Sequence, residues 1–480
     1  MKICILGLDG ATLQLIFGDE RLANVRRLME LGVYGELQST VPPGAVPGWI
    51  CLATSQDPGS LGIYGLRNRP DCSYSAPVPA ASTGVQAALW DQVAAAGKKT
   101  IVVAVPPIFP HQRIAGVSIG RSLTSDPAGD EFTFPAGLKD IIHELMGDYP
   151  ADINFAGQSQ DELRERIFDM SRKHWEAVRW LLREQEWDYF HFVDAGLDRV
   201  QRAFWRYFDP QHPQYQPGSP YQEVISDYHL WLDEQVGSVL ELLDAETVLL
   251  LVSTNGARAL DGGFAINQWL QREGLLVLNQ PPGPGITPFD RLNINWTRTR
   301  VWGGGGPCAS LYFNVQGREP QGVIPAQDYE AFRDELKTRL ESLCEDGGRP
   351  LQPQVFKPNR LYRQTRNVAP DLIVQLNEGR RPAIESVGHP GLYVRDVADG
   401  CTPATPGIFV LTAPNCPLNG AYEGAHLLDM APTVLDLAGY EIPASTQGRS
   451  LVAGMEKRRG DAGPDSDQII LDRLAGLGYV

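Results

Sequence analysis

Short apolar runs alternate with helical segments along almost the whole chain, and this alternation limits the folds available to it. The expected strands are residues 2–8, 99–105, 188–193, 248–253, 371–375 and 408–412. The expected helices are residues 22–31, 85–95, 161–185, 221–243, 266–271 and 427–438. Strands joined through helices pair in parallel, because each crossover returns the chain in the same direction. The pattern therefore predicts an α/β sandwich with a mostly parallel central sheet.

Polar residues directly follow three of these strands. Asp9 follows the first strand, Asp194 or Asp198 follows the run at 188–193, and Thr254-Asn255 follows the run at 248–253. In open α/β sheets, ligands bind beyond the carboxyl ends of the strands. We therefore expect these side chains to meet at one edge of the sheet.

Composition narrows the possible partners. The chain has 480 residues, 43% of them hydrophobic, and a formal net charge of −16. So acidic a chain is unsuited to nucleic acid or an anionic membrane, since both attract basic surfaces. A small ligand remains possible, because a few placed arginines can bind an anion. The composition leaves the oligomeric state open.

The sequence indicates a cytoplasmic protein. Seven cysteines are dispersed without a CxxC pair, which is typical of a reducing compartment. The N-terminus lacks the long apolar stretch of a signal peptide, and no run approaches the ~20 apolar residues of a membrane span.

Two regions depart from the alternation. Residues 280–358 are rich in Gly, Pro and polar side chains, which predicts an inserted cap with irregular structure. Residues 457–467 are charged and contain Gly and Pro, as in a linker, and residues 469–480 have the pattern of a short helix. We predict one α/β domain at residues 1–450, with the cap inserted at about 280–358, and a linker with a tail helix at 451–480.

Several segments, in order, carry a family resemblance. They are residues 7–12 (GLDGAT), 40–49 (TVPPGAVPGW), 57–69, 198–205 (DRVQRAFW), 253–270, 369–373 (APDLI), 406–409 (PGIF) and 429–433 (DMAPT). Together they resemble the type I phosphodiesterase/nucleotide pyrophosphatase branch of the alkaline phosphatase superfamily, from residue 2 to about residue 450. The resemblance implies the alkaline-phosphatase-like three-layer sandwich.

The resemblance also implies a two-metal centre with a Ser or Thr nucleophile. Asp9 and Asp198 match two metal-ligand positions of the family, and both are retained. The other matched positions carry Ala45 in place of the nucleophile, Arg202 and Asn255 in place of His, Thr254 in place of Asp, and Pro403 in place of His. Neither Thr nor Asn is a good transition-metal ligand. We therefore expect no metal and no other cofactor.

Asp198 and Arg202 are four residues apart, so on a helix they share a face. We expect Arg202 to supply the positive charge that a metal supplies in the family. The candidate catalytic residues are Asp9, Asp198 and Arg202. The expected pocket-lining residues are Ala45, Trp49, Tyr64, Thr254, Asn255, Pro403 and His389.

Simpler interpretations stand beside these. Asp9 could cap a helix, Asp198 and Arg202 could be an ordinary helix ion pair, and Trp49 could be a core residue. Arg67 and Arg69 could reach an anionic ligand or lie on the surface. Five histidines have polar or Pro-rich neighbours typical of surface residues: His111, His143, His174, His212 and His229.

The favoured function is a degenerate phosphodiesterase-fold protein without two-metal hydrolysis. It would be either a metal-independent enzyme acting on a small molecule or a non-catalytic binding protein. The alternative is a metal-dependent phosphodiesterase or nucleotide pyrophosphatase with an altered ligand set drawn from Asp9, Asp194, Asp198 and His389. A third interpretation is assembly with a catalytic relative through the acidic surface and the tail.

Overall fold

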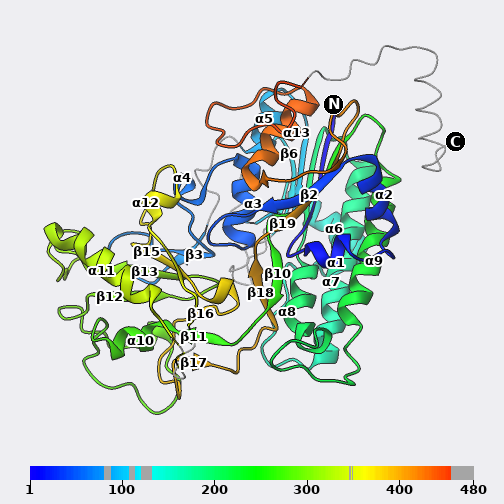
Figure 1. Ribbon diagram of the computed structural model, residues 1–480. Helices are drawn as coiled ribbons and strands as arrows, with labels where there is room; N and C mark the ends of the chain where they lie inside the picture. Colours follow the sequence, from blue (N-terminus) through cyan, green and yellow to red (C-terminus); the bar gives the residue numbers. More distant parts are fainter. Residues whose placement is uncertain (81–87, 107–113, 121–131, 345–347, 349, 456–480) are drawn as a thin grey trace, which may run out of the picture.

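A computed structural model describes residues 1–80, 88–106, 114–120, 132–344, 348 and 350–455 (Figure 1). The predicted tail helix at 469–480, the linker at 457–467 and His111 lie outside these ranges. None of the helices in the described ranges combines the length and the apolar character that crossing a bilayer requires.

A ten-stranded sheet forms the centre of the molecule. Its order is β20 (Gly420–Ala421), β2 (Val33–Gln38), β19 (Gly407–Thr412), β9 (Val248–Ser253), β1 (Ile3–Leu8), β8 (Tyr189–Asp194), β5 (Thr100–Val103), β6 (Gly116–Ile119) and β7 (Thr133–Phe134), and β21 (Ala425–His426) also pairs with β2. The five strands from β9 to β6 run parallel, as the alternation predicted. The sheet as a whole is mixed, because β19 runs antiparallel to both of its neighbours and β7 runs antiparallel to β6.

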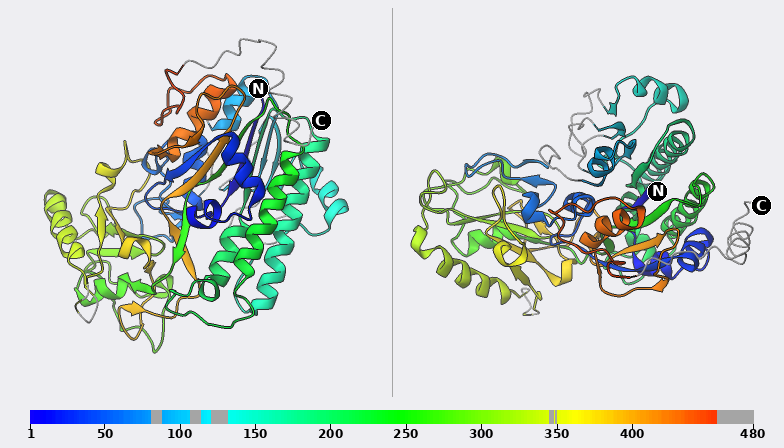
Figure 2. Two further views of the ribbon diagram at one scale, coloured as in Figure 1. Left: turned by 45° about the vertical axis from the view of Figure 1, so that its right-hand side comes forward. Right: turned by 90° about the horizontal axis from the view of Figure 1, so that it is seen from above.

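Helices cover both faces of the sheet (Figure 2). One face carries α1 (Leu13–Phe17), α2 (Ala23–Leu31), α6 (Leu138–Met146), α7 (Gln160–Glu184), α8 (Gly196–Phe208) and α9 (Val224–Leu240). The other carries α3 (Ala45–Thr54), α5 (Leu89–Ala95) and α13 (Met430–Ala438), which follows the 3₁₀ turn η4 (Leu427–Asp429). Alternate residues of each strand serve the two faces: Leu6 packs under the first group of helices and Ile5 under the second. The three-layer α/β sandwich is confirmed.

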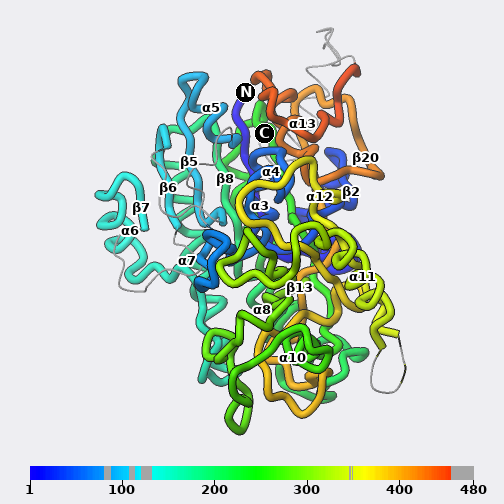
Figure 3. Tube along the Cα trace, turned by 90° about the vertical axis from the view of Figure 1, so that its left-hand side faces the viewer, coloured from blue at the N-terminus to red at the C-terminus, as the bar shows by residue number. Residues whose placement is uncertain are grey.

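A smaller part packs beside this sandwich and has a core of its own (Figure 1). Its antiparallel sheet has the order β12 (Val301–Gly304), β13 (Ala309–Phe313), β15 (Leu372–Gln375) and β14 (Gln354–Phe356). With it lie α10 (Ile266–Arg272), α11 (Tyr329–Glu341), η1 (Phe289–Arg291) and η2 (Ala326–Asp328). Figure 3 looks onto this side and shows α10, β13 and α11 grouped together.

Residues 280–358 are more regular than their composition indicated. They contain β12, β13, α11 and β14. Phe332, Leu336 and Leu340 recur every four residues in α11 and are buried, so a helical signal was present among the glycines and prolines. The strand at 371–375 also belongs to this smaller sheet and not to the central one.

Short elements connect the two parts. They are α4 (Pro58–Leu61), the hairpin β3 (Arg67–Asn68) with β4 (Val78–Pro79), the pair β10 (Gly256–Ala259) with β18 (Cys401–Ala404), the strands β11 (Gly263–Ala265), β16 (Ala383–Ile384) and β17 (Tyr393–Val394), α12 (Pro358–Leu361) and η3 (Asn377–Gly379). Arg69 does not lie on the surface: it is buried, pairs with Glu319 at 3.3 Å and lies over the Trp302 ring. It therefore joins the hairpin region to the smaller part.

Candidate functional site

Three parallel strands bring their polar ends to one place, as predicted. Leu8 at the end of β1 lies opposite Asp194 at the end of β8, and the Asp9 amide donates to the Asp194 carbonyl at 3.0 Å. Gly7 lies opposite Val252 of β9, the strand that ends at Ser253. The turn after β9 therefore starts next to the turn after β1.

Asp9 is buried beside Trp49 of α3. The indole Nε1 of Trp49 donates to Asp9 Oδ1 at 3.2 Å. Burial, and after it the charge of Asp198, raise the pKa of Asp9 to about 7. Gly7 admits the indole, because a Cβ there would lie 2.4 Å from Trp49 Cη2. Trp49 is thus both a core residue and a hydrogen-bond partner of the carboxylate.

Asp198 lies in the first turn of α8 and faces two guanidinium groups. Arg202 Nε lies 2.7 Å from Asp198 Oδ2, and Arg199 pairs with the same oxygen. Burial alone would raise the pKa of Asp198, but the charges of Arg202 and Arg199 outweigh burial and hold the pKa below its ordinary value.

Each of the two arginines also pairs with a second aspartate. Arg199 binds Asp152 through two bonds of 2.7 and 2.8 Å, and Arg202 Nη1 lies 2.9 Å from Asp399 Oδ2. We call the five residues, Asp152, Arg199, Asp198, Arg202 and Asp399, the arginine–aspartate chain. From the sequence only the pair of Asp198 and Arg202 was predicted, because these residues are four positions apart on a helix. Asp152 and Asp399 are remote in sequence, and Arg199 is the immediate neighbour of Asp198, so helical spacing does not predict their pairing.

The side chains of Thr254 and Asn255, in the turn after β9, form hydrogen bonds within that turn. Thr254 Oγ1 donates to Asn255 Oδ1 at 3.2 Å, and Asn255 Nδ2 donates to the Gly256 carbonyl at 3.0 Å. Both side chains are buried. Gly48 of α3 packs against this turn, and a Cβ at that position would lie 2.7 Å from Thr254 Oγ1.

Two further predicted residues lie on elements that pack against this turn, Ala45 on α3 and Pro403 on β18. Ala45 begins α3 after Gly44, whose φ of 144° is open only to glycine. Pro403 is buried in β18 opposite Ala257, one residue pair beyond Gly256. The structure therefore brings Trp49, Thr254, Asn255 and Pro403 to the ends of β1 and β9, and Ala45 begins the helix that carries Trp49.

Tyr64 and His389 contact other groups. The Tyr64 hydroxyl donates to the Arg366 carbonyl at 2.6 Å, and its ring packs with Tyr362. His389 Nε2 lies 2.9 Å from Ser386 Oγ, in a loop between β16 and β17. Neither hydrogen bond involves Asp9 or the turn after β9.

Three histidines expected at the surface are buried. His174 bonds the Pro150 carbonyl at 2.7 Å, His229 bonds the Ile225 carbonyl at 2.7 Å, and His212 bonds the Gly400 carbonyl at 3.1 Å. Each imidazole satisfies a backbone carbonyl inside the fold, which its polar sequence neighbours did not indicate. His143 is exposed as expected.

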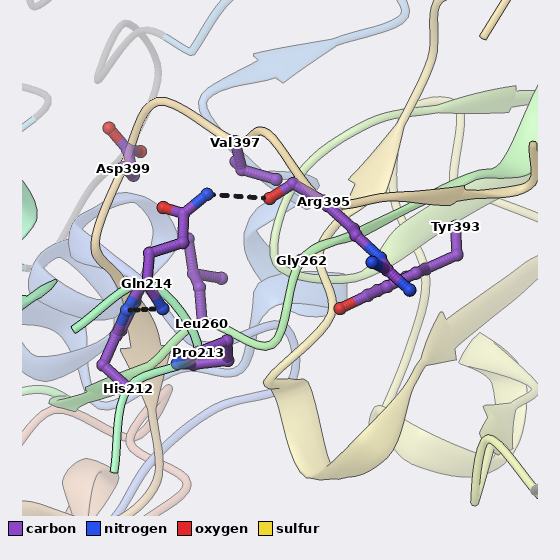
Figure 4. Close-up of a pocket in the computed structure, with 9 residues that line it drawn as sticks. All are labelled: His212, Pro213, Gln214, Leu260, Gly262, Tyr393, Arg395, Val397 and Asp399. Carbon is purple, nitrogen blue, oxygen red and sulfur yellow. Dashed lines mark hydrogen bonds between the residues drawn. The ribbon is translucent and has the colours of Figure 1, made fainter. Parts of the chain in front are cut away.

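A pocket lies next to the arginine–aspartate chain (Figure 4). Its volume is about 250 Å³. It is lined by His212, Pro213, Gln214, Leu260, Gly262, Tyr393, Arg395, Val397 and Asp399. Asp399 lines the pocket and is also the last member of the arginine–aspartate chain. No sequence pattern predicted this pocket, because its lining comes from three separate parts of the chain.

Potential metal ligands do not cluster in the part of the chain that the structure describes. No group of three or more His, Cys, Asp or Glu side chains is placed there to hold a metal ion. Asp194 accepts a hydrogen bond from the Tyr228 hydroxyl at 2.8 Å, so its carboxylate faces the helical layer.

The sheet, its helical layers and the polar strand ends define a protein of the alkaline-phosphatase-like α/β class. The profile described as type I phosphodiesterase/nucleotide pyrophosphatase matches residues 3–386. The chain belongs to this family. No curated protein sequence matches it.

Two solved structures share the fold at low identity. Phosphonoacetate hydrolase from Sinorhizobium meliloti 1021, in complex with phosphonoacetate, has a TM-score of 0.54 and 14% identity, with 91% of this chain and 96% of the other covered. Human ectonucleotide pyrophosphatase/phosphodiesterase 5 has a TM-score of 0.51 and 13% identity, with 92% and 96% covered. At these identities the likeness concerns the fold alone.

Proposed function

We propose that this chain is a non-catalytic member of its family that binds a small molecule and performs no two-metal hydrolysis. The observation that carries the proposal is the arginine–aspartate chain. Asp198, one of the two carboxylates retained at family ligand positions, already pairs with Arg199 and Arg202. Two guanidinium groups would repel a dication that approaches Asp198, and the dication could bind only by displacing them.

The second retained carboxylate supports the same proposal. Asp9 accepts the Trp49 indole N–H, and its raised pKa means that it resists ionisation inside the fold. The Trp49 indole occupies Oδ1 of Asp9, and within the described residues Asp9 belongs to no group of three or more His, Cys, Asp or Glu side chains placed to hold a metal ion. The donor set at the strand ends therefore does not fit a two-metal centre.

The remaining positions offer neither ligand nor nucleophile. Ala45 has no hydroxyl, and Thr254 and Asn255 are buried in hydrogen bonds within their own turn. These side chains thus fill the space at the strand ends. This favours a non-catalytic binding protein over an enzyme with its active site at this position. The alternative ligand set is not supported, because Asp194 bonds Tyr228 and His389 bonds Ser386.

One observation favours a second candidate, a metal-independent enzyme. A carboxyl that titrates near neutral pH is suited to general acid–base catalysis. Asp9 is such a group, with a pKa raised to about 7. It is only 4% exposed, however, so a substrate would have to reach it through packed side chains.

Hydrolysis of bis(4-nitrophenyl) phosphate tests the proposal. We expect the purified protein to match the buffer blank in excess Zn²⁺, Mn²⁺ or Mg²⁺ and also in EDTA. The Asp9→Asn variant is the control for contaminating activity. Metal-dependent turnover that Asp9→Asn abolishes would overturn the proposal, and metal-independent turnover with the same sensitivity would establish the second candidate.

A further inference from the structure

The pocket beside Asp399 lies between three loops that come from different parts of the chain. Residues 212–214 follow α8, residues 260–262 join β10 to β11, and residues 393–399 comprise β17 and the loop that leads to β18. Hydrogen bonds hold the loops together: Gln214 Nε2 donates to the Arg395 carbonyl at 3.2 Å and His212 bonds the Gly400 carbonyl. Figure 4 shows both Gln214 and His212 at the wall of the cavity.

The lining of this pocket includes two charged side chains, Arg395 and Asp399, and they differ in their partners. The carboxylate of Asp399 is already engaged, because Arg202 lies 2.9 Å from its Oδ2. Arg395 is exposed and lies 5.9 Å from the centre of the Tyr393 ring, and within the described ranges no carboxylate pairs with it. An arginine that lies over an aromatic ring without a counter-ion is suited to receive an anion.

The rest of the lining is suited to an apolar body. Leu260, Val397 and Pro213 contribute apolar surface, and the Tyr393 ring adds a flat one (Figure 4). The volume of about 250 Å³ is slightly below the roughly 300–1,000 Å³ of sites for drug-sized ligands. A ligand of this pocket is therefore small, with one anionic end and one apolar end.

We propose that this pocket binds a small organic carboxylate, with the anion at Arg395 and the apolar body against Leu260, Val397 and Tyr393. The inference rests on the proposed binding function and gives it a site and a ligand class. The lining of the pocket includes none of Asp9, Thr254 and Asn255, and Asp399 is the residue that the pocket shares with the arginine–aspartate chain.

Benzoate is the probe, because it combines a carboxylate with an apolar ring. Binding to the full-length protein is followed by saturation-transfer NMR and calorimetric titration, in EDTA so that metals play no part. We expect saturable benzoate binding, much weaker binding of acetate, which lacks the ring, and much weaker binding of benzyl alcohol, which lacks the charge. Phenyl phosphate tests whether the site prefers a phosphate to a carboxylate. Tighter binding of phenyl phosphate than of benzoate would overturn the carboxylate assignment.

Two variants locate the site. Arg395→Gln should weaken benzoate binding about tenfold or more, since it removes a charge-assisted contact. Arg360→Gln, at an exposed arginine on α12 away from the pocket, should leave binding unchanged. Val397→Phe fills the cavity while keeping Arg395 and should also abolish binding. Equal binding by Arg395→Gln and the wild type would overturn the inference, and so would absence of benzoate binding. Because the titration contains no metal, this inference can fail while the proposal of no two-metal hydrolysis stands.

Discussion

Arg202 Nε lies 2.7 Å from Asp198 Oδ2, one helical turn along α8, at the edge where the parallel strands end. The same guanidinium reaches Asp399 at 2.9 Å. Asp198 is nearly buried, and a buried carboxylate without a positive partner is costly. Arg202, with Arg199, gives Asp198 that positive charge without a metal.

Loss of the Arg202 charge should destabilise the metal-free protein. We expect Arg202→His to lower the free energy of unfolding by about 1–3 kcal/mol, less than for a fully buried pair because Arg199 still neutralises Asp198. Urea denaturation in EDTA measures the loss, and added Zn²⁺ should reduce it. Arg172→His is the control, because Arg172 pairs with Asp169 on the exposed side of α7 and should cost only a few tenths of a kcal/mol. Unchanged stability of Arg202→His in EDTA would show that Asp198 does not depend on this charge.

The carboxyl of Asp9 should make stability depend on pH. Its folded-state pKa is raised to about 7 from 3.8, so between these values the folded chain holds a proton that the unfolded chain releases. The contribution of Asp9 is complete below about pH 4 and is lost as the pH rises through about 7. We expect Asp9→Asn to gain stability relative to the wild type as the pH rises. Urea denaturation from about pH 5 to about pH 8 measures this, and parallel curves for the two proteins would refute it.

The indole N–H of Trp49 should stabilise the ionised form of Asp9. We expect Trp49→Phe to cost about 1–3 kcal/mol more at pH 8 than Trp90→Phe, since it leaves a buried acceptor without its donor. Trp90 is the matched control: it is also buried, and its Nε1 has no hydrogen-bond partner among the described residues. The difference should shrink at pH 5, where Asp9 is protonated. Equal costs for the two variants at both pH values would contradict this role of Trp49.

A carboxylate restored at position 254 should not be tolerated without a cation. Thr254 is fully buried, and its hydroxyl bonds only within its own turn. We expect Thr254→Asp to destabilise the metal-free protein by about 3 kcal/mol or more, because it buries an unpaired charge. Thr254→Val keeps the shape and should cost much less. Thermal unfolding of the two variants in EDTA compares them, and similar melting temperatures would be evidence against the account.

The convergence of Asp9, Asp194 and the 254–255 turn was predictable because each follows an apolar run of strand length. Every residue of β1, β8 and β9 is buried, as a continuous apolar run predicts, and parallel pairing brings the ends of these strands together. The pair of Asp198 with Arg202 was predictable from helical spacing alone. These features depend on local sequence, which is why they could be read from it.

Other parts of the site depend on long-range packing. Asp152 and Asp399 join the arginine–aspartate chain from 46 residues before and 201 residues after Asp198, so no spacing rule links them. Arg69 was ambiguous because its partner, Glu319, lies in a different part of the fold. The regular structure within residues 280–358 was missed because abundant Gly and Pro obscured the four-residue repeat of Phe332, Leu336 and Leu340.

The most direct test of the central claim is the metal content of the purified protein. The protein is dialysed to equilibrium against Zn²⁺, Mn²⁺ or Mg²⁺, and bound metal is measured by elemental analysis against the dialysis buffer, so that weakly held ions are counted. The account predicts no stoichiometric metal in the wild type and the same result for Asp9→Asn. Two equivalents of metal in the wild type, lost in Asp9→Asn, would contradict it.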